Sequence, residues 1–339
     1  MKRSAYADLF YVNKIDVMMS GEFNLIEKYF VGRQNQRKDV HLAGGDDCAL
    51  VKAPANVQIA ISTDTLVAGT HFLPHANPAW VAHKALASNI SDLAAMGATP
   101  AWVSFALTMP EPDEAWLAPF CDAFFALADY FGIQLIGGDT TKGPLSLTLT
   151  VQGFVAEGKA LQRSGANVGD WVYVTGNLGD AKAGLDVILD DALRHRVGAE
   201  ALEKAHYLST PRVLAGQALV GLASSAIDIS DGLISDIKHI LQRSQVGVSI
   251  DVSQLPISSE LAQFLDDKVS AQQYALSSGE EYELCFTVSE QNRGSLQSAL
   301  SHIGCKVTCI GQIRPNGTFE LHDNHQPLDW DLSGFDHFQ

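Results

Sequence analysis

The sequence has no long apolar run, and this absence excludes one large class of protein. None of its apolar stretches reaches the roughly 18 residues that a membrane-spanning helix needs. The basic first residues resemble the start of a signal peptide. However, two aspartates, an asparagine and a lysine within residues 8–16 interrupt the apolar segment that would have to follow. We therefore expect a cytoplasmic protein that has no membrane partner.

Cysteine and clustered positive charge are also scarce. The five cysteines are scattered and form no Cys-x-x-Cys pair, which favours core thiols over a metal site. Sets of histidine and cysteine suited to zinc are absent as well. The formal net charge of −16 argues against nucleic acid or an anionic membrane surface as a partner. A phosphorylated ligand is compatible with this charge, provided that cations mediate its binding.

Two widespread motifs of phosphate chemistry are missing from the sequence. There is no Gly-x-x-x-x-Gly-Lys-Ser/Thr segment of the kind that forms a phosphate-binding loop. The set of motifs that marks protein kinases is also absent. Neither of these two scaffolds therefore explains the acidic residues described below.

The length and the order of predicted elements indicate two domains. A chain of 339 residues is long enough for two domains of roughly 150 residues each. Residues 1–18 show no periodicity, and we interpret them as a disordered extension. Alternating strand and helix patterns over residues 19–156 predict an N-terminal α/β domain, and a second α/β domain occupies residues 157–339. The predicted fold class is therefore α+β or α/β with two domains.

Aspartates recur where predicted strands end and in loops. One strand pattern begins at Val57 and runs into Ser62, Thr63 and Asp64, and comparable carboxylates occur at Asp46, Asp139, Asp228 and Asp231. Residues 41–100 contain four aspartates and two lysines but no glutamate or arginine. Because buried carboxylates without cations repel one another, the pattern indicates hard cations such as Mg²⁺. Such ions are held by carboxylates together with water and substrate phosphates.

Two further segments carry polar residues in suggestive positions. Lys84, Ser88 and Asp92 are spaced by four residues on a predicted helix over residues 79–96, so they share one face. An exposed polar stripe is as good an interpretation of this face as a functional one. Glycines that follow the predicted buried strand at residues 133–136 suggest a close approach of the backbone to a ligand, and Asp139 beside them suits a metal.

Seven motifs in the chain occur in the order typical of bacterial thiamine-monophosphate kinases, and the sequence resembles that family from about residue 20 to its last residues. The motifs are Gly-Asp-Asp-Cys-Ala, Ile-Ser-Thr-Asp-Thr-Leu-Val-Ala-Gly-Thr-His-Phe, Asn-Ile-Ser-Asp-Leu-Ala-Ala-Met-Gly-Ala, Leu-Ile-Gly-Gly-Asp-Thr-Thr, Arg-Ser-Gly-Ala, Asp-Ile-Ser-Asp-Gly-Leu and Ser-Gly-Glu-Glu-Tyr-Glu-Leu. The family belongs to the superfamily of aminoimidazole ribonucleotide synthetase. The resemblance implies an N-terminal sheet domain that forms a homodimer, a C-terminal α/β domain, and ATP bound between the domains.

The resemblance also implies an activity and a set of site residues. The implied reaction is the ATP-dependent phosphorylation of thiamine monophosphate to thiamine diphosphate. The implied ligands of several Mg²⁺ ions are Asp46, Ser62, Thr63, Asp64, Asp92, Asp139, Asp228 and Asp231. The implied contacts of ATP are Gly138, Arg163 and Ser230, and those of thiamine monophosphate are His71, Glu280 and Phe335.

The chain departs from the family pattern at three places, of which the first, Gly44-Gly45-Asp46 in place of the usual Gly-Ile-Gly-Asp, is a conservative change. Cys121 stands where many members have a tyrosine near the nucleotide, so that contact does not carry over. Phe335 stands where relatives have tryptophan or tyrosine, so an aromatic ring is kept but a hydroxyl or indole hydrogen bond is lost.

The expected mechanism is direct in-line transfer without a protein general base, because the acceptor is already a phosphate anion. Arg163 and the metal ions would stabilise the charge on the phosphates. Two alternatives stay open: a non-catalytic regulatory module that binds Mg-ATP, and a related ATP-using synthetase of the same superfamily.

Overall fold

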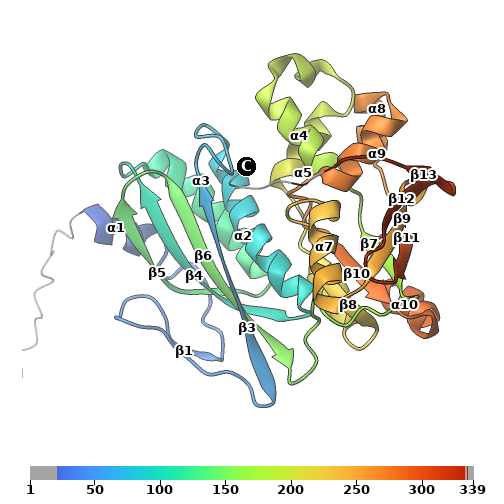
Figure 1. Cartoon of the computed structure of the whole chain (residues 1–339). Helices are drawn as coiled ribbons and strands as arrows, with labels where there is room; N and C mark the ends of the chain where they lie inside the picture. Colours follow the sequence, from blue (N-terminus) through green and yellow to red (C-terminus); the bar gives the residue numbers. More distant parts are fainter. Residues whose placement is uncertain (1–20, 333, 335–339) are drawn as a thin grey trace, which may run out of the picture.

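The computed structural model describes residues 21–332 and 334, with side chains from Asn24 onward (Figure 1). The predicted extension over residues 1–18 and the predicted acceptor contact Phe335 lie outside the described residues. The chain forms two sheet-containing halves that lie side by side, and this arrangement confirms the predicted two-domain α/β fold.

A four-stranded mixed sheet is the centre of the N-terminal half. Its strands lie in the order β3, β6, β4, β5; β4 pairs with β5 in parallel, and the other pairs are antiparallel. A small antiparallel pair, β1 and β2, is separate from it. The bounds are β1 (Val40–Leu42), β2 (Leu50–Val51), β3 (Val57–Val67), β4 (Thr99–Met109), β5 (Gln134–Lys142), β6 (Ser146–Ala156), α1 (Gly21–Tyr29), α2 (Pro78–Ala95) and α3 (Glu114–Tyr130).

A seven-stranded mixed sheet forms the C-terminal half, in the order β13, β12, β9, β11, β7, β10, β8. Its strands are β7 (Trp171–Thr175), β8 (Ala223–Asp228), β9 (Gly247–Asp251), β10 (Leu284–Val288), β11 (Val307–Arg314), β12 (Phe319–Asp323) and β13 (Gln326–Leu328). The α-helices are α4 (Asp180–Leu189), α5 (Ala199–Tyr207), α6 (Val213–Leu219), α7 (Leu233–Ser244), α8 (Ser259–Leu265), α9 (Lys268–Ser277) and α10 (Arg293–Leu300). Short 3₁₀ turns are η1 (Asp191–His195), η2 (Val252–Gln254) and η3 (Glu290–Asn292).

Helix α2 lies between the two halves (Figure 1). It begins where the Asn77 side chain accepts a hydrogen bond from the Ala79 amide at 2.9 Å, with proline in the first turn. One side of the helix packs on β3 and β6, and another side packs on α6 and β8. Lys84 and Ser88 are therefore only 1% and 3% exposed. The interpretation of this face as an exposed polar stripe is wrong, because the second half of the protein covers it.

Strand β3 differs from the sequence prediction in its length and its orientation. The predicted strand ends near Asp64, whereas β3 continues to Val67 and pairs with β6 along its whole length. Ile59 and Ile61 are 45% and 65% exposed, while the Ser62 side chain faces α2. The polar face of this strand is thus the covered one. The two isoleucines leave an apolar strip on the outer face of the sheet.

Strand β5 also runs beyond its predicted end at Ile136. It continues through both glycines to Lys142, in parallel register with β4. A Cβ atom at Gly138 would lie 1.9 Å from the Phe105 carbonyl oxygen. The close approach of two strands therefore requires glycine at this position, independently of any ligand.

Within the described residues, no helix combines the length and the apolar character needed to cross a membrane.

Candidate active site

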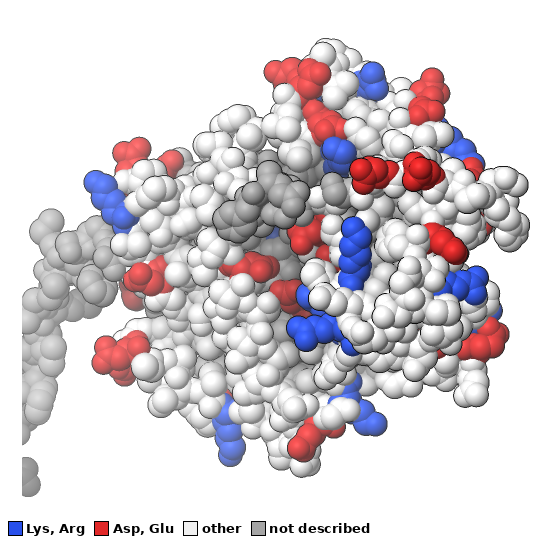
Figure 2. Space-filling view, in the orientation of Figure 1, with Lys and Arg blue, Asp and Glu red and all other residues white. Residues whose placement is uncertain are grey.

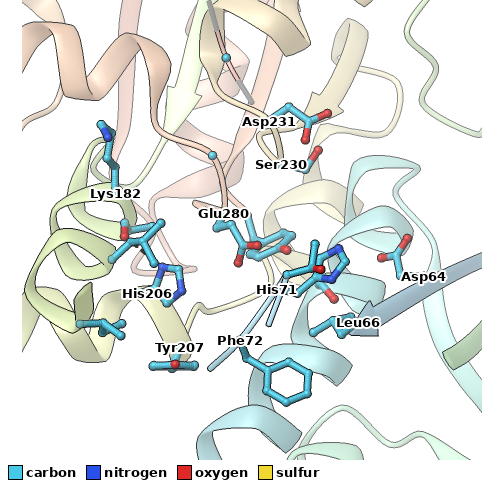
Figure 3. A pocket seen from close by; sticks show the side chains of 18 of the residues that line it. Asp64, Leu66, His71, Phe72, Lys182, His206, Tyr207, Ser230, Asp231 and Glu280 are labelled. Carbon is cyan, nitrogen blue, oxygen red and sulfur yellow. Dashed lines mark hydrogen bonds between the residues drawn. The ribbon is translucent and has the colours of Figure 1, made fainter. Parts of the chain in front are cut away.

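A cavity of about 870 Å³ lies between the two halves (Figure 3). Its walls are the end of β3 with the following loop, α2, helices α4 and α5, and the loops that precede α7 and β10. Acidic side chains are visible in the hollow between the halves in the space-filling view (Figure 2). This cavity therefore brings together segments that are more than 200 residues apart in the sequence.

Four of the aspartates predicted to bind metal line this cavity, each from a different element. Asp64 is on β3, Asp92 is on α2, Asp228 ends β8, and Asp231 is in the loop before α7. Hydrogen bonds from other elements hold two of them, since Ser62 Oγ donates to Asp92 and Ser91 Oγ donates to Asp228 Oδ2 at 2.8 Å. The structure thus brings these four aspartates together in one cavity.

Burial raises the pKa values of Asp64, Asp92 and Asp228. Burial raises the pKa of Asp64 to about 6, and the charges of Asp92 and Asp231 add to the shift. Burial, followed by the charge of Asp92, raises the pKa of Asp228 to about 8. The Asp92 pKa is also raised by burial. The ionised forms are thus destabilised by a lack of water and by one another.

Protein cations do little to offset this negative charge. No lysine or arginine in the part of the chain that the structure describes forms an ion pair with these four aspartates. Arg163 acts at longer range: its positive charge opposes the rise in the pKa of Asp92 that burial causes, and the net shift is still upward. Nor do any three His, Cys, Asp or Glu side chains within the described residues form a complete metal site. Mg²⁺ suits such an arrangement, because it takes one or two carboxylates and completes its shell with water and phosphate oxygens.

A second cavity, of about 740 Å³, holds the remaining predicted aspartates. It is lined by α1, the segment 43–49 and the first part of β5. Asp46, Gly138 and Asp139 lie here rather than in the first cavity. The structure therefore divides the predicted metal ligands into two groups.

Comparisons with known proteins decide the family. The model of AIR synthase related protein, N-terminal domain, matches residues 45–155, and that of the C-terminal domain matches residues 167–324. A thiamine-monophosphate kinase of Escherichia coli (strain K12) is 54% identical over 325 residues, covering 95% of this chain and 99% of that protein. The chain belongs to the thiamine-monophosphate kinase family.

Solved structures of this family have the same fold. The thiamine-monophosphate kinase from Stenotrophomonas maltophilia K279a has a TM-score of 0.80 and 42% identity, over 84% of this chain and 92% of that one. AaThiL, solved in complex with AMPPCP and TMP, has a TM-score of 0.75 and 28% identity, over 93% and 96% of the two chains.

The other site residues that the family suggests are placed as follows. His71, Ser230 and Glu280 line the first cavity (Figure 3). Arg163 is in the loop after β6, where its carbonyl accepts from Ser244 Oγ at 3.2 Å. The side chain of Thr63 points to the opposite face of β3 from Ser62 and bonds to Thr150 at 2.9 Å, so only its backbone faces the cavity. The roles of these residues stay predictions.

His71 has a defined tautomer. Its Nδ1 accepts a hydrogen bond from the Val67 amide at 3.0 Å, so in the neutral ring the proton is on Nε2. The neutral side chain can therefore donate a hydrogen bond through Nε2, but it presents no basic nitrogen toward the cavity.

Asp236 is a site residue that the sequence prediction missed. Its Oδ2 accepts hydrogen bonds from the amides of Ser230, Asp231 and Gly232 at 3.0, 3.0 and 3.1 Å. Asp236 belongs to the first turn of α7 and is 2% exposed. The carboxylate thereby fixes the loop that presents Ser230 and Asp231 to the cavity. The only sequence signal was the local spacing of Asp231, Gly232 and Asp236.

We expect Asp236→Ala to lower the free energy of unfolding by about 1–3 kcal/mol, since it leaves one buried and two partly buried amides without an acceptor. It should also weaken Mg²⁺ binding, because the Asp231 loop loses its support. Thermal unfolding with and without Mg²⁺ measures both effects. Asp113→Ala is the matched control. Asp113 also accepts hydrogen bonds from two backbone amides, but it lies at the exposed start of α3, away from the cavity. Equal Mg²⁺ stabilisation of both variants would contradict the role assigned to Asp236.

Proposed function

We propose that this enzyme transfers the γ-phosphoryl group of ATP to the phosphate of thiamine monophosphate, forming thiamine diphosphate. The observation that carries the proposal is the composition of the first cavity. One side presents four carboxylates, and the other side presents apolar and aromatic side chains from α4, α5 and the loop after β3. The second side suits a heteroaromatic molecule, while the carboxylates suit metal-bound phosphates. Family membership and the bound AMPPCP and TMP of AaThiL support the same assignment.

The acidic residues fit magnesium, and we propose that they hold it in two groups. Asp64, Asp92, Asp228 and Asp231, with Ser62 and the Thr63 backbone nearby, would bind ions in the first cavity. Asp46 and Asp139 would bind in the second cavity, where Gly138 would meet the nucleotide. Bound ions would neutralise negative charge on the donor and acceptor phosphates.

The proposed transfer is in-line and needs no protein base. The second pKa of a phosphate monoester is about 6, so near pH 7 the acceptor already carries a nucleophilic oxygen. The hydrogen bond that His71 Nδ1 accepts from Val67 supports this view, because the neutral ring can only donate toward the cavity. We assign His71 to the acceptor phosphate as a hydrogen-bond donor, Ser230 to ATP, and Phe335 to the thiamine rings. Arg163 would offset repulsion between the two phosphates.

The function is tested by ADP release with separate acceptors. With Mg-ATP, thiamine monophosphate should stimulate ADP release, whereas unphosphorylated thiamine and aminoimidazole ribonucleotide should not. A regulatory module that binds Mg-ATP predicts no stimulation by any acceptor. A related synthetase predicts stimulation by a different acceptor.

We also propose that the N-terminal half, up to about residue 156, forms a homodimer through its sheet. Strand β3 is at the edge of its sheet, and this edge pairs with no other strand within the described chain. The side chains of Ile59 and Ile61 on the same strand are exposed on the outer face of the sheet. An exposed edge with an apolar strip is usually covered in a stable protein.

For this interface, Ile61→Lys should convert a dimer into a monomer at micromolar concentration, because it places a charge in the contact. Light scattering gives the mass. Val197→Lys is the control, since Val197 is similarly exposed (67%) but lies in the C-terminal half. A wild-type protein that is already monomeric would contradict the proposal.

A further inference from the structure

Lys84 is a buried cation outside the group of predicted site residues. It projects from α2 and is 1% exposed, although an ammonium group is rarely buried without acceptors. Three acceptors surround it. Glu280 Oε2 forms an ion pair with Nζ, His206 Nε2 lies at 2.8 Å, and the centroid of the Tyr207 ring lies at 5.4 Å. The charge of Lys84 is therefore balanced by Glu280, while His206 and Tyr207 supply the other contacts of the ammonium group.

His206 is held neutral in one tautomer. Its Nδ1 lies 3.1 Å from the Ala181 carbonyl oxygen, which can only accept, so Nδ1 carries the proton. Nε2 then has a lone pair for Lys84. Burial, and after it the charge of Lys84, lowers the pKa of His206 to about 3. His206 therefore adds an acceptor to the site without adding a charge.

Glu280 is the member of this group that reaches the cavity. Its side chain is 27% exposed and lines the first cavity, while Oε2 is buried against Lys84. Its backbone has a φ of 66°, which is uncommon for a residue with a side chain, and its amide donates to the Ser230 carbonyl at 2.7 Å. The orientation of the carboxylate is thus fixed from both the backbone and the side chain.

These contacts join the two halves of the protein at the cavity. Lys84 belongs to α2 in the N-terminal half, whereas His206 on α5 and Ala181 on α4 belong to the C-terminal half. Glu280 is in the loop before β10, and His206 and Tyr207 are drawn near it in Figure 3. Replacement of Lys84 would therefore remove the ion pair that holds the Glu280 carboxylate at the cavity.

We propose that Lys84 and His206 are positioning residues that hold Glu280 as an oriented carboxylate for the cationic heteroaromatic end of the acceptor. The proposal rests on the proposed function for the identity of the acceptor. A carboxylate repels a phosphate, so its favourable partners in this cavity are the positive thiazolium ring and the amino group of the pyrimidine. Lys84 does not line the cavity, and His206 directs Nε2 to Lys84, so both act on the acceptor through Glu280.

A double-mutant cycle tests this assignment with Lys84→Met, Glu280→Gln and the double variant. Each single variant should raise the KM for thiamine monophosphate by on the order of tenfold, with a smaller change in kcat and an unchanged KM for ATP. The double variant should match Glu280→Gln alone rather than show the product of the two effects, because Lys84 has nothing left to position. Multiplying effects, or a normal acceptor KM in Lys84→Met, would overturn the proposal.

Further measurements keep the test decisive. If Lys84→Met does not fold, His206→Leu should raise the acceptor KM, and His206→Gln should restore it, since an amide oxygen can accept from Lys84. Failure of the glutamine variant to restore KM counts against the proposal. Lys204→Met, which removes an exposed lysine on the same helix as His206, is the control with normal kinetics.

Thermal unfolding without substrate separates this proposal from the proposed function. Lys84→Met should lower the melting temperature by leaving Glu280 unpaired, and the double variant should recover part of the loss. If the melting temperatures show this coupling but the protein does not phosphorylate thiamine monophosphate, the proposed function is refuted, while the ion pair between Lys84 and Glu280 stands. Absence of coupling in an active enzyme would refute the positioning role alone.

Discussion

The Asp64→Asn variant is expected to lose phosphoryl transfer by on the order of 100-fold or more while keeping its fold. Asparagine has nearly the volume of aspartate, but its neutral amide is a poorer ligand for Mg²⁺. Burial, with the charges of Asp92 and Asp231 adding to it, raises the pKa of Asp64 to about 6, so removal of this buried charge relieves desolvation and repulsion in the metal-free protein. Its melting temperature without Mg²⁺ should therefore equal or exceed that of the wild type.

The Asp64→Asn variant should bind Mg²⁺ more weakly as well as turn over more slowly. An ion that binds the folded state raises the melting temperature according to its affinity, so Mg²⁺ should stabilise the variant less than the wild type. Excess Mg²⁺ should restore part of the activity. Asp267→Asn is the control, because Asp267 caps α9 and asparagine caps a helix equally well. Ordinary activity of Asp64→Asn at ordinary Mg²⁺ concentrations would remove Asp64 from the set of metal ligands.

The His71→Asn variant is expected to raise the KM for thiamine monophosphate about 10- to 100-fold, which is the value of a hydrogen bond to a charged group. Its kcat should change much less. His71 is a donor at Nε2 because Nδ1 is engaged by Val67, so the variant loses binding rather than proton transfer. Steady-state kinetics with each substrate varied in turn give the two constants.

The pH profile provides the sharper part of this test. If the acceptor supplies its own ionised oxygen, activity should fall in acid near pH 6 in the wild type and in His71→Asn alike. Loss of this acidic limb in the variant, together with a fall of kcat by orders of magnitude, would identify His71 as a base. The proposed mechanism would then be wrong.

The residue types of the site could be picked out from the sequence more readily than their arrangement in space. Aspartates at loop and strand ends, without neighbouring cations, led to the hypothesis of a metal-phosphate site, and the structure places Asp64, Asp92, Asp228 and Asp231 in one cavity. The excess of aspartates over nearby basic residues can be counted directly in the sequence, so it needs no knowledge of the fold. Whether Asp46 and Asp139 join them depends on the packing of the segment 43–49 against α1 and β5, and spacing along the chain carries no information on that.

The orientation of β3 and the burial of Lys84 could not be predicted for a related reason. Alternation along a strand shows that two faces differ, but it does not show which face α2 covers. In β3 the covered face is the polar one, since Ser62 meets Asp92 there. Lys84 was seen to share a helical face with Asp92, yet its acceptors come from residues 206 and 280, which only the assembled halves bring close.

The destination of the γ-phosphate tests the central claim most directly. The enzyme is incubated with γ-labelled ATP, Mg²⁺ and an equimolar mixture of thiamine monophosphate, unphosphorylated thiamine and other phosphate monoesters, and the labelled products are separated. The account predicts that the label appears as the terminal phosphate of thiamine diphosphate, in an amount equal to the ADP formed, and that chelation of Mg²⁺ abolishes the transfer. Label found in inorganic phosphate or in another acceptor, or ADP formed without labelled thiamine diphosphate, would contradict it.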